Sequence, residues 1–226
     1  MKINYNFFQI ILHELCLSSS LIKNLIFNYE RRKFINNAQL KNINHVFITG
    51  LARSGTTALL ESLHLTQGFG CLTYEDMPFV LAPNTWAGIR KGKPKNTLTE
   101  RAHGDGVKYG LKSPEAFEEI FWQSINDENK CEDFKDYVSL ILKKCRKNRY
   151  LSKNNQNIHR ISTILNIFPK AIFLVPFRKP FDHALSLFEQ HQRFCDFQTK
   201  KKFIKRYMEL TYHVEFGLTY KVQYKG

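Results

Sequence analysis

The segment HVFITGLARSGTTALLESL, residues 45–63, constrains the fold more than any other part of the sequence. Its first five residues form a short apolar run, which is typical of a strand buried on both faces. Gly50 and Gly55 then permit a tight turn, and residues 56–65 are expected to form a helix. A strand that leads into a helix N-terminus presents backbone N–H groups to an anion. The segment therefore predicts a phosphate-binding loop.

The loop differs in its cation from the version that binds nucleoside triphosphates. That version reads G-x-x-x-x-G-K-[ST], whereas residues 50–57 read GLARSGTT, with Thr56 in place of the lysine. Arg53 brings the positive charge instead. Because a guanidinium grips an anion as a fork, we expect a ligand that carries an anion without a γ-phosphate.

A second apolar run, AIFLV at residues 171–175, is expected to be another buried strand, and a cation follows it too. Triphosphate enzymes of this architecture usually have an aspartate there that helps to hold Mg²⁺, but this chain has Arg178. Ser186 comes eight residues later, about two turns into the next expected helix. Since ligands of parallel sheets sit beyond the carboxyl ends of the strands, Arg178 and Ser186 predict a second anion site and no metal.

Helices that alternate with isolated buried strands predict an α/β fold, a P-loop NTPase-like three-layer α/β/α arrangement with a central parallel sheet. With 226 residues, one domain is expected over residues 1–226, with an N-terminal helical segment at about 1–40. Glu118 and Glu119 are expected to form a charged first helical turn. The expected helices cover residues 7–35, 56–65, 114–125, 133–147, 158–168 and 181–194, and residues 91–106 are expected to form a polar loop.

The net charge of +14 admits a nucleic-acid partner, a polyanionic small ligand, or surplus surface lysine. The basic residues are scattered and lack the aromatic side chains of a single-strand-binding surface, so no nucleic acid is expected. No run reaches the ~20 apolar residues that cross a bilayer. The five cysteines form no C-x-x-C pair, which suits reduced thiols. We therefore expect a cytoplasmic location without a transmembrane segment.

The two anion sites together resemble those of sulfotransferases that use 3′-phosphoadenosine-5′-phosphosulfate (PAPS), and the likeness runs from about residue 45 to 195. The segment FPKAIFLVPFRKP, residues 168–180, is similar to that family as well. In the family, an R-S-G-T-T loop cradles the 5′-phosphosulfate, and an arginine with a serine eight positions later binds the 3′-phosphate. The resemblance implies these donor-binding residues: Arg53, Ser54, Gly55, Thr56 and Thr57 for the first group, and Arg178 and Ser186 for the second.

A narrower likeness concerns TYEDMPFVLAPN, LKSPEAFEEIFW and LSKNNQNIHRI, which resemble bacterial sulfotransferases that modify surface polysaccharides. It implies a hydroxyl acceptor on a carbohydrate or glycolipid. Members of the family continue with a basic loop that closes over the adenine and the 3′-phosphate. This sequence ends at HVEFGLTYKVQYKG, so we expect either that this loop is absent or that the chain is a fragment of the family domain.

Metal-independent, in-line sulfuryl transfer needs a base for the acceptor hydroxyl and a cation for the leaving phosphate. Glu75 is the candidate base, because tyrosyl-protein sulfotransferases similarly place a catalytic glutamate about 22 residues after the loop arginine. Lys153 is the candidate cation, since it precedes Arg178 by 25 residues and the same relatives have a lysine at a similar offset. Alternatives for the base are Asp76 and the pair His103 and Asp105.

Two other kinds of protein remain open from the sequence. One is a P-loop nucleotide kinase-like protein, against which the missing loop lysine and the missing magnesium carboxylate argue. The other is a basic nucleic-acid-binding protein or an inactive fragment of an enzyme, whose affinity would fall steeply with salt.

Overall fold

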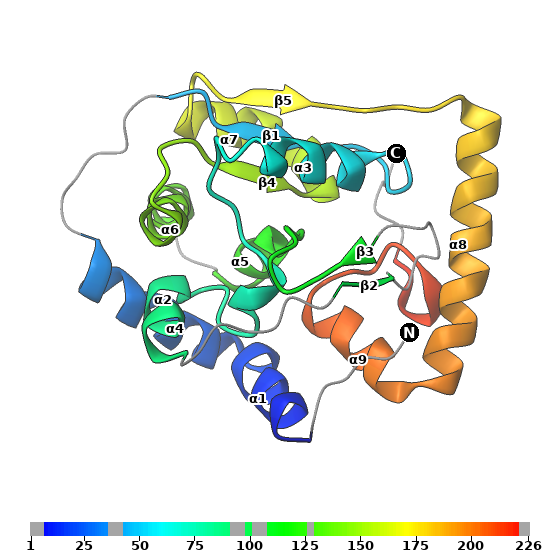
Figure 1. Ribbon diagram of the computed structural model, residues 1–226, viewed down its shortest axis with the longest axis horizontal. Helices are drawn as coiled ribbons and strands as arrows, with labels where there is room; N and C mark the ends of the chain where they lie inside the picture. Colours follow the sequence, from blue (N-terminus) through cyan, green and yellow to red (C-terminus); the bar gives the residue numbers. More distant parts are fainter. Residues whose placement is uncertain (1–6, 36–42, 91–97, 101–107, 126–128, 222–226) are drawn as a thin grey trace.

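The computed structural model describes residues 7–35, 43–90, 98–100, 108–125 and 129–221, which form an α/β fold around a parallel sheet (Figure 1). The sheet has the strand order β4–β1–β5. The central strand is β1 (Val46–Ile48), flanked by β4 (Leu151–Lys153) and β5 (Ile172–Leu174), and both pairings are parallel. The pairing aligns Ile48 with Lys153 and with Leu174, so the three strands end at one edge of the sheet.

The helices lie mostly around this sheet, and a small antiparallel pair of strands lies apart from it. No single helix of the described residues is long and apolar enough to cross a membrane; α1 and α2 meet the length and composition test only as a pair, bent by 87°. The helices are α1 (Phe7–Ser18), α2 (Ser20–Phe34), α3 (Thr56–Leu65), α4 (Pro83–Ile89), α5 (Glu118–Ser124), α6 (Lys130–Cys145), α7 (Ile161–Ile167), α8 (Pro180–Lys200) and α9 (Lys202–Leu210); the pair is β2 (Thr99–Glu100) and β3 (Lys108–Tyr109), and short 3₁₀ turns cover Tyr74–Asp76, Asn155–Arg160 and Gly217–Thr219.

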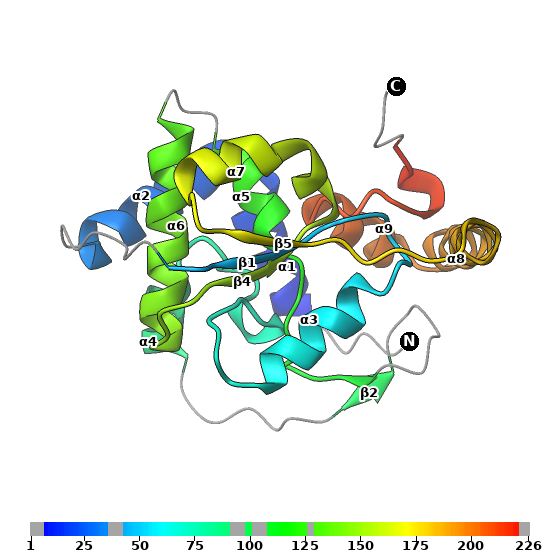
Figure 2. The same cartoon turned by 90° about the horizontal axis from the view of Figure 1, so that it is seen from above.

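Side chains of β1 alternate between the two faces of the sheet, as a strand requires. Val46 and Ile48 belong to a cluster with Leu60 of α3, whereas Phe47 belongs to the larger core on the other face. Figure 2 shows α3 on one side of the strands and α7 on the other. The predicted three-layer α/β/α arrangement with a central parallel sheet is therefore confirmed.

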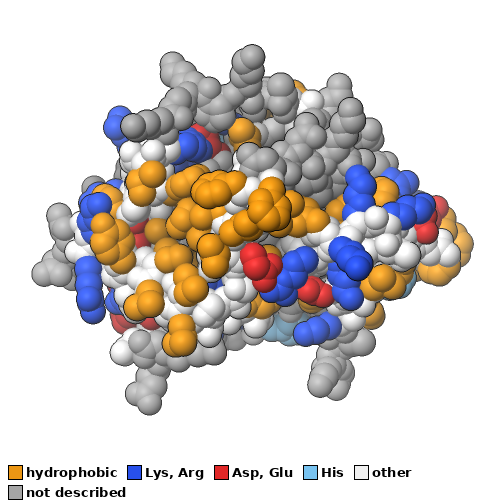
Figure 3. Space-filling view, turned by 90° about the horizontal axis from the view of Figure 1, so that it is seen from below, with side chains coloured by type: hydrophobic (Ala, Val, Ile, Leu, Met, Phe, Trp, Pro, Cys, Tyr) orange, Lys and Arg blue, Asp and Glu red, His pale blue; other side chains and the backbone are white. Residues whose placement is uncertain are grey.

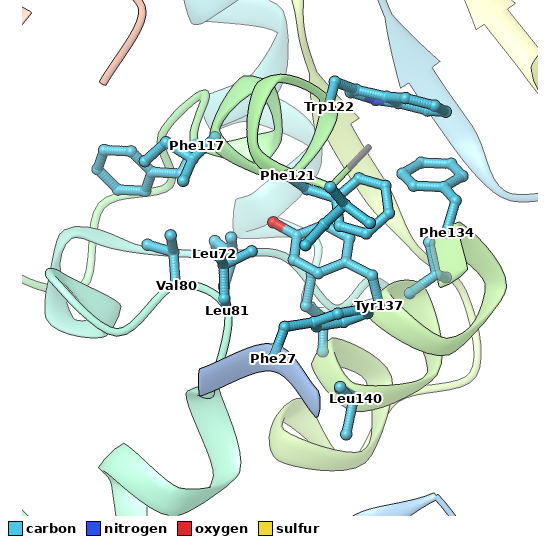
Figure 4. Close-up of a cluster of buried hydrophobic side chains, with 14 of the residues drawn as sticks. Phe27, Leu72, Val80, Leu81, Phe117, Phe121, Trp122, Phe134, Tyr137 and Leu140 are labelled. Atoms are coloured by element: carbon cyan, nitrogen blue, oxygen red, sulfur yellow. The ribbon is translucent and has the colours of Figure 1, made fainter. Parts of the chain in front are cut away.

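The larger core is built from aromatic side chains that α2, α5 and α6 contribute (Figure 4). Phe121 of α5 stacks on Tyr137 of α6 with ring centroids 4.7 Å apart, and Phe27 of α2 meets Phe121 edge to face at 5.5 Å. All three side chains are at most 1% exposed. Burying a side chain of this size stabilises a fold by about 1.5–3 kcal/mol, so this cluster fixes the helices behind the sheet.

A third, smaller cluster lies away from the sheet, where α8 and α9 pack together with the last 3₁₀ turn. The long helix α8 stands at the end of the molecule, and an extended segment after β5 leads into it (Figure 1). Phe194 of α8, Met208 of α9 and Phe216 form the centre of this cluster. It holds α8 so that the first turns of the helix lie beside the end of β1.

Three expectations from the sequence are corrected. The helix expected at residues 114–125 begins at Glu118, because Pro114 forms a bridge with Thr73 instead. The run AIFLV is not buried on both faces: β5 is an edge strand, and Ile172 is 38% exposed. The segment expected as a polar loop at residues 91–106 includes the short strand β2.

Strand β4 was not expected, although it is fully buried. A further segment extends the sheet beyond it, since Gly70 forms an isolated parallel bridge with Tyr150. The Gly70 N–H donates to the Arg149 carbonyl (2.8 Å), and the Leu151 N–H donates to the Gly70 carbonyl (3.0 Å). The chain that leads to Glu75 therefore runs beside β4 in the same direction.

Candidate functional site

The loop after β1 is shaped for close backbone approach to a ligand. Gly50 and Gly55 have φ values of +131° and +101°, and Arg53 has φ 67°, a conformation that L side chains rarely adopt. From α3, the Leu59 N–H bonds back to this turn through the Gly55 carbonyl at 3.1 Å, and within the turn the Ser54 N–H donates to the Leu51 carbonyl at 3.3 Å. The N–H groups that precede Leu59 at the start of α3 are thus available to an anion, as in other helix N-termini.

The structure brings Arg53, Arg178 and Ser186 together from three separate segments. The Arg53 Nε donates to the Ser186 Oγ at 3.2 Å, and the Arg178 Nη1 donates to the Arg53 carbonyl at 3.3 Å. Arg178 is exposed and Ser186 is half-buried. Two guanidinium groups therefore lie at the start of α3, where an anionic ligand would be held by charge and by hydrogen bonds.

Other predicted donor-binding residues mainly shape this loop. The Ser54 hydroxyl donates to the Leu51 carbonyl at 2.8 Å and is buried, and Thr56 is only 3% exposed at the first position of α3. Thr57 is half-buried. The Ser54 N–H also donates to the Leu51 carbonyl, at 3.3 Å. The backbone N–H groups of the first turn of α3, more than the hydroxyls of Ser54 and Thr56, are therefore the groups that an anion could use.

His183 is a contact that the sequence reasoning missed. Its Nε2 lies 2.7 Å from the Ala52 carbonyl, so the ring N–H donates to the loop backbone. His183 is buried, and it lies three residues before Ser186 on the same face of α8. This helical spacing from Ser186 was the signal that could have placed His183 beside the loop.

Lys153 ends β4 at the same edge of the sheet as the loop. The Asn154 N–H donates to the Ile48 carbonyl (2.9 Å), and the Thr49 hydroxyl donates to the Asn155 carbonyl (3.1 Å), so the ends of β4 and β1 are joined. Lys153 is only 9% exposed. Within the described ranges no side chain or carbonyl bonds to its ammonium group.

A buried polar network holds the strand that carries Lys153. Glu119 accepts two hydrogen bonds from Arg160, at 2.7 and 2.8 Å, and another from Asn154 at 2.8 Å. Glu118 accepts from the Tyr150 hydroxyl at 2.9 Å, and burial, followed by this carboxylate, raises the pKa of Tyr150 so that it stays a donor. The two glutamates form the first turn of α5, as predicted, and both are also buried hydrogen-bond acceptors.

Glu75, the predicted base, follows the segment beside β4. Its carboxylate pairs with the Arg90 guanidinium, and its carbonyl accepts from Arg90 and from the Trp86 indole N–H, both at 3.0 Å. The Glu75 side chain is 15% exposed. Arg90, which no sequence pattern singled out, therefore fixes the position of Glu75.

The alternative candidates for the base, Asp76 and the pair His103 and Asp105, have different surroundings from Glu75. Asp76 is 2% exposed; its carboxylate caps the Thr73 N–H (2.8 Å) and pairs with Lys144 (2.8 Å). A carboxylate with these partners stabilises the turn and has no access to an acceptor hydroxyl. His103 and Asp105 lie outside the described residues.

Three parts of the chain thus reach one edge of the sheet: the loop after β1, Lys153 at the end of β4, and Arg178 after β5. This is the edge at which parallel sheets bind ligands. The segment that leads to Glu75 runs beside β4, and Glu75 itself contacts Arg90 and Trp86. No three His, Cys, Asp or Glu side chains of the described ranges are grouped so that they could hold a metal ion. Metal independence itself stays a prediction.

Comparison with known proteins agrees with this geometry. A model described as "Sulfotransferase family" matches residues 45–218. Among solved structures, sulfotransferase STF1 from Mycobacterium tuberculosis has a TM-score of 0.54 and 13% identity over 84% of this chain and 60% of its own. Sulfotransferase STF9 from Mycobacterium avium has a TM-score of 0.48 and 11% identity over 93% of this chain and 74% of its own. The chain thus spans 60% of the length of STF1, and the curated proteins include no match.

Proposed function

Because the chain belongs to the sulfotransferase family, we propose that it transfers a sulfuryl group from PAPS to an acceptor hydroxyl. The observation that carries this proposal is the convergence of Arg53, Arg178 and Ser186 at the N-terminus of α3. Two guanidinium groups and a helix N-terminus suit a donor with two separate anionic groups.

The proposed contacts divide between the two groups of the donor. The backbone N–H groups at Gly55, Thr56 and Thr57, together with Arg53, would bind the 5′-phosphosulfate. Ser54 would keep this loop in shape through its bond to the Leu51 carbonyl. Arg178 and Ser186 would bind the 3′-phosphate.

In the proposed reaction, the acceptor oxygen forms a bond to sulfur while the bond between sulfur and the bridging phosphate oxygen breaks. The electron pair of that bond stays on the phosphate, where the Lys153 ammonium would stabilise the added charge. Glu75 would take the proton of the acceptor hydroxyl. The buried position of Lys153 favours this role, since a cation in a site that excludes water acts more strongly.

The acceptor is proposed to be a carbohydrate or a glycolipid. Support comes from the narrower sequence likeness described above, together with the family membership, which implies a hydroxyl-bearing acceptor. Incubation with sulfur-35-labelled donor and a panel of polysaccharides, glycolipids and peptides would test it. Label in peptides alone would contradict a carbohydrate acceptor.

Donor binding can be tested by thermal unfolding with 3′-phosphoadenosine 5′-phosphate, with ATP–Mg²⁺ and with inorganic phosphate. The first ligand should stabilise the protein by about 2.7 kcal/mol at a concentration of 100 Kd. Arg53→Ala and Arg178→Ala should abolish this stabilisation, and the exposed Arg32→Ala, on α2, should retain it. Preferential stabilisation by ATP–Mg²⁺ would instead support a nucleotide kinase-like protein.

The catalytic roles can be separated from donor binding by measuring turnover with the labelled donor and donor affinity by thermal unfolding. Lys153→Ala and Glu75→Gln should lower turnover by about 10²-fold or more while donor affinity changes little, because both groups act on charges that move in the transition state. Equal losses of turnover and of donor affinity would show that Lys153 only binds the donor. Lys170→Ala is the matched control, since this lysine is exposed near the start of β5.

A further inference from the structure

Helices α1 and α2 present large apolar side chains to solvent. Phe7 and Phe8 are 78% and 70% exposed on α1, and Leu21 and Leu25 are 75% and 69% exposed on α2. The exposed apolar residues follow the same spacing on both helices, which places them on one face of each helix. We call them the α1–α2 apolar face: Phe7, Phe8, Ile11, Leu15, Leu21, Ile22, Leu25 and Tyr29.

Polar contacts on the inner side fix this orientation of the helices. Lys23 is 2% exposed and donates to the Tyr212 hydroxyl at 2.9 Å. Glu30 is fully buried and accepts from the Asn84 N–H (2.7 Å) and the Thr85 hydroxyl (2.5 Å). A surface helix ordinarily turns its polar side to water, whereas α2 buries charged residues and exposes leucines. The apolar face is therefore a defined surface of the molecule.

Basic side chains border this face. Figure 3 shows apolar side chains gathered in the middle of this side of the molecule, with lysine and arginine side chains on both sides of them. Exposed basic residues at the two ends are Arg32 and Lys33 of α2, and Lys202 and Lys205 of α9. Arg206, next to Lys205 on α9, pairs with both Glu14 and Glu209, so these three side chains together carry one net negative charge.

We propose that the α1–α2 apolar face docks onto the surface of an anionic lipid bilayer. Leucine and phenylalanine side chains on one side of a helix enter the boundary between headgroups and acyl chains, and lysine and arginine beside them attract anionic lipids. The 87° bend between α1 and α2 lets both helices lie along a surface instead of forming one straight rod. This docking surface lies apart from the donor site and does not depend on the proposed reaction.

Charge favours a bilayer over a second copy of the chain as the partner. A second copy would bring the same basic border against itself, on a chain with a net charge of +14. Like charges brought together in this way oppose association. An anionic surface complements both the apolar face and its basic border.

Co-sedimentation with phosphatidylcholine vesicles, with and without phosphatidylglycerol, tests this proposal. The unaltered chain should bind vesicles that contain phosphatidylglycerol and bind pure phosphatidylcholine about tenfold more weakly. The variant Phe8→Ser/Leu21→Ser/Leu25→Ser should lose about tenfold or more in vesicle affinity. Leu65→Ser is its control, because Leu65 is 76% exposed on α3, outside the face. Thermal unfolding of each variant verifies that it is folded.

A second pair of variants separates the basic border from overall charge. Lys202→Glu/Lys205→Glu should remove the preference for phosphatidylglycerol, while Lys170→Glu, outside the face, should change it little. The proposal is wrong if anionic vesicles do not bind the chain, or if they bind it equally after the apolar substitutions. It is also wrong if light scattering shows a dimer that the apolar substitutions dissociate.

Discussion

Strand β4 is buried along its whole length, whereas β5, on the other side of β1, leaves Ile172 38% exposed. The residues after β4 continue into a network around Glu118 and Glu119, but β5 is followed by Phe177, which is 90% exposed. The same central strand thus has one flank packed by the protein and one flank open to solvent.

This difference indicates that the two halves of the candidate site are preorganised to different degrees before a ligand binds. On the β4 side, hydrogen bonds hold the strand that carries Lys153 before any ligand arrives. On the β5 side, Arg178 is exposed, and its one side-chain hydrogen bond to the described residues goes to the Arg53 carbonyl at 3.3 Å. A preorganised cation suits a group that acts in a transition state, and an exposed arginine suits a group that closes onto a bound ligand.

The largest expected effect is loss of the β4 network. Glu119→Ala should lower the free energy of unfolding by about 3 kcal/mol, because it leaves the Arg160 guanidinium without its buried carboxylate. In a chain of this size, the melting temperature should fall by about 6–12 °C. Arg178→Ala, on the open flank, should change stability by less than about 0.5 kcal/mol. Equal effects in chemical denaturation would contradict the contrast between the flanks.

The second-largest effect is expected from acid, which should lower the stability of the β4 side. His45 Nδ1 accepts the Tyr150 N–H at 3.1 Å, and burial, followed by the nearby Arg149, lowers the pKa of His45 to about 4. The unfolded chain, with a histidine pKa of about 6.5, binds more protons, so stability should fall by about 2–3 kcal/mol as the pH falls from 6.5 to 4.

A non-titrating variant isolates this effect. His45→Gln should reduce the slope of unfolding free energy against pH in urea titrations, and the part of the slope that remains is expected from His13, whose pKa burial also lowers to about 4. An unchanged slope would exclude His45 as a source of the acid sensitivity.

A smaller, opposite effect is expected at Lys153. Lys153→Met keeps the length of the side chain and removes a largely buried charge that has no partner within the described residues, so stability should rise by about 1 kcal/mol. Sulfuryl transfer should be lost at the same time. Lys170→Met, at an exposed position, should leave both stability and activity unchanged. A destabilised Lys153→Met variant would show that the ammonium group serves the fold.

The smallest effect is expected on the open flank. Phe177→Ser should alter the free energy of unfolding by less than about 0.5 kcal/mol, since the ring is 90% exposed. Phe173→Ser, four residues earlier, should cost more than about 1 kcal/mol, because Phe173 stacks on the buried Phe47 with centroids 5.5 Å apart. Comparable losses for the two variants would mean that residues after β5 are packed like the strand itself.

The sequence was sufficient to predict those parts of the fold that depend on residues close together in the chain. The strand β1 and the helix at residues 56–65 were both predicted, because each depends on neighbouring residues. The same holds for the turn with Gly50 and Gly55 between them. Strand β4 was missed because Leu151–Lys153 is short and mostly polar. It is buried through partners that are far from it in the sequence, such as strand β1 and Glu119, which accepts from the adjacent Asn154.

In the candidate site, too, local spacing could be predicted from the sequence, whereas contacts between distant residues could not. The spacing of Arg178 and Ser186 was visible in the sequence, and both lie at the loop. Nothing in the sequence could separate Glu75 from Asp76, because the difference comes from distant partners. Lys144, 68 residues from Asp76, engages the latter, and Arg90 engages the former.

Arg53 joins the two predicted anion sites: its carbonyl accepts from Arg178, and its side chain donates to Ser186. If these residues bind the two phosphates of one donor, the sites are thermodynamically linked. A ligand fragment that orders Arg53 at one site lowers the cost of ordering the other, so the affinities of two separate fragments would rise together and by the same factor. The loop and α8 would then select for the distance between the two anions, and a nucleotide with only one of them would lose the coupling free energy in addition to the missing contacts.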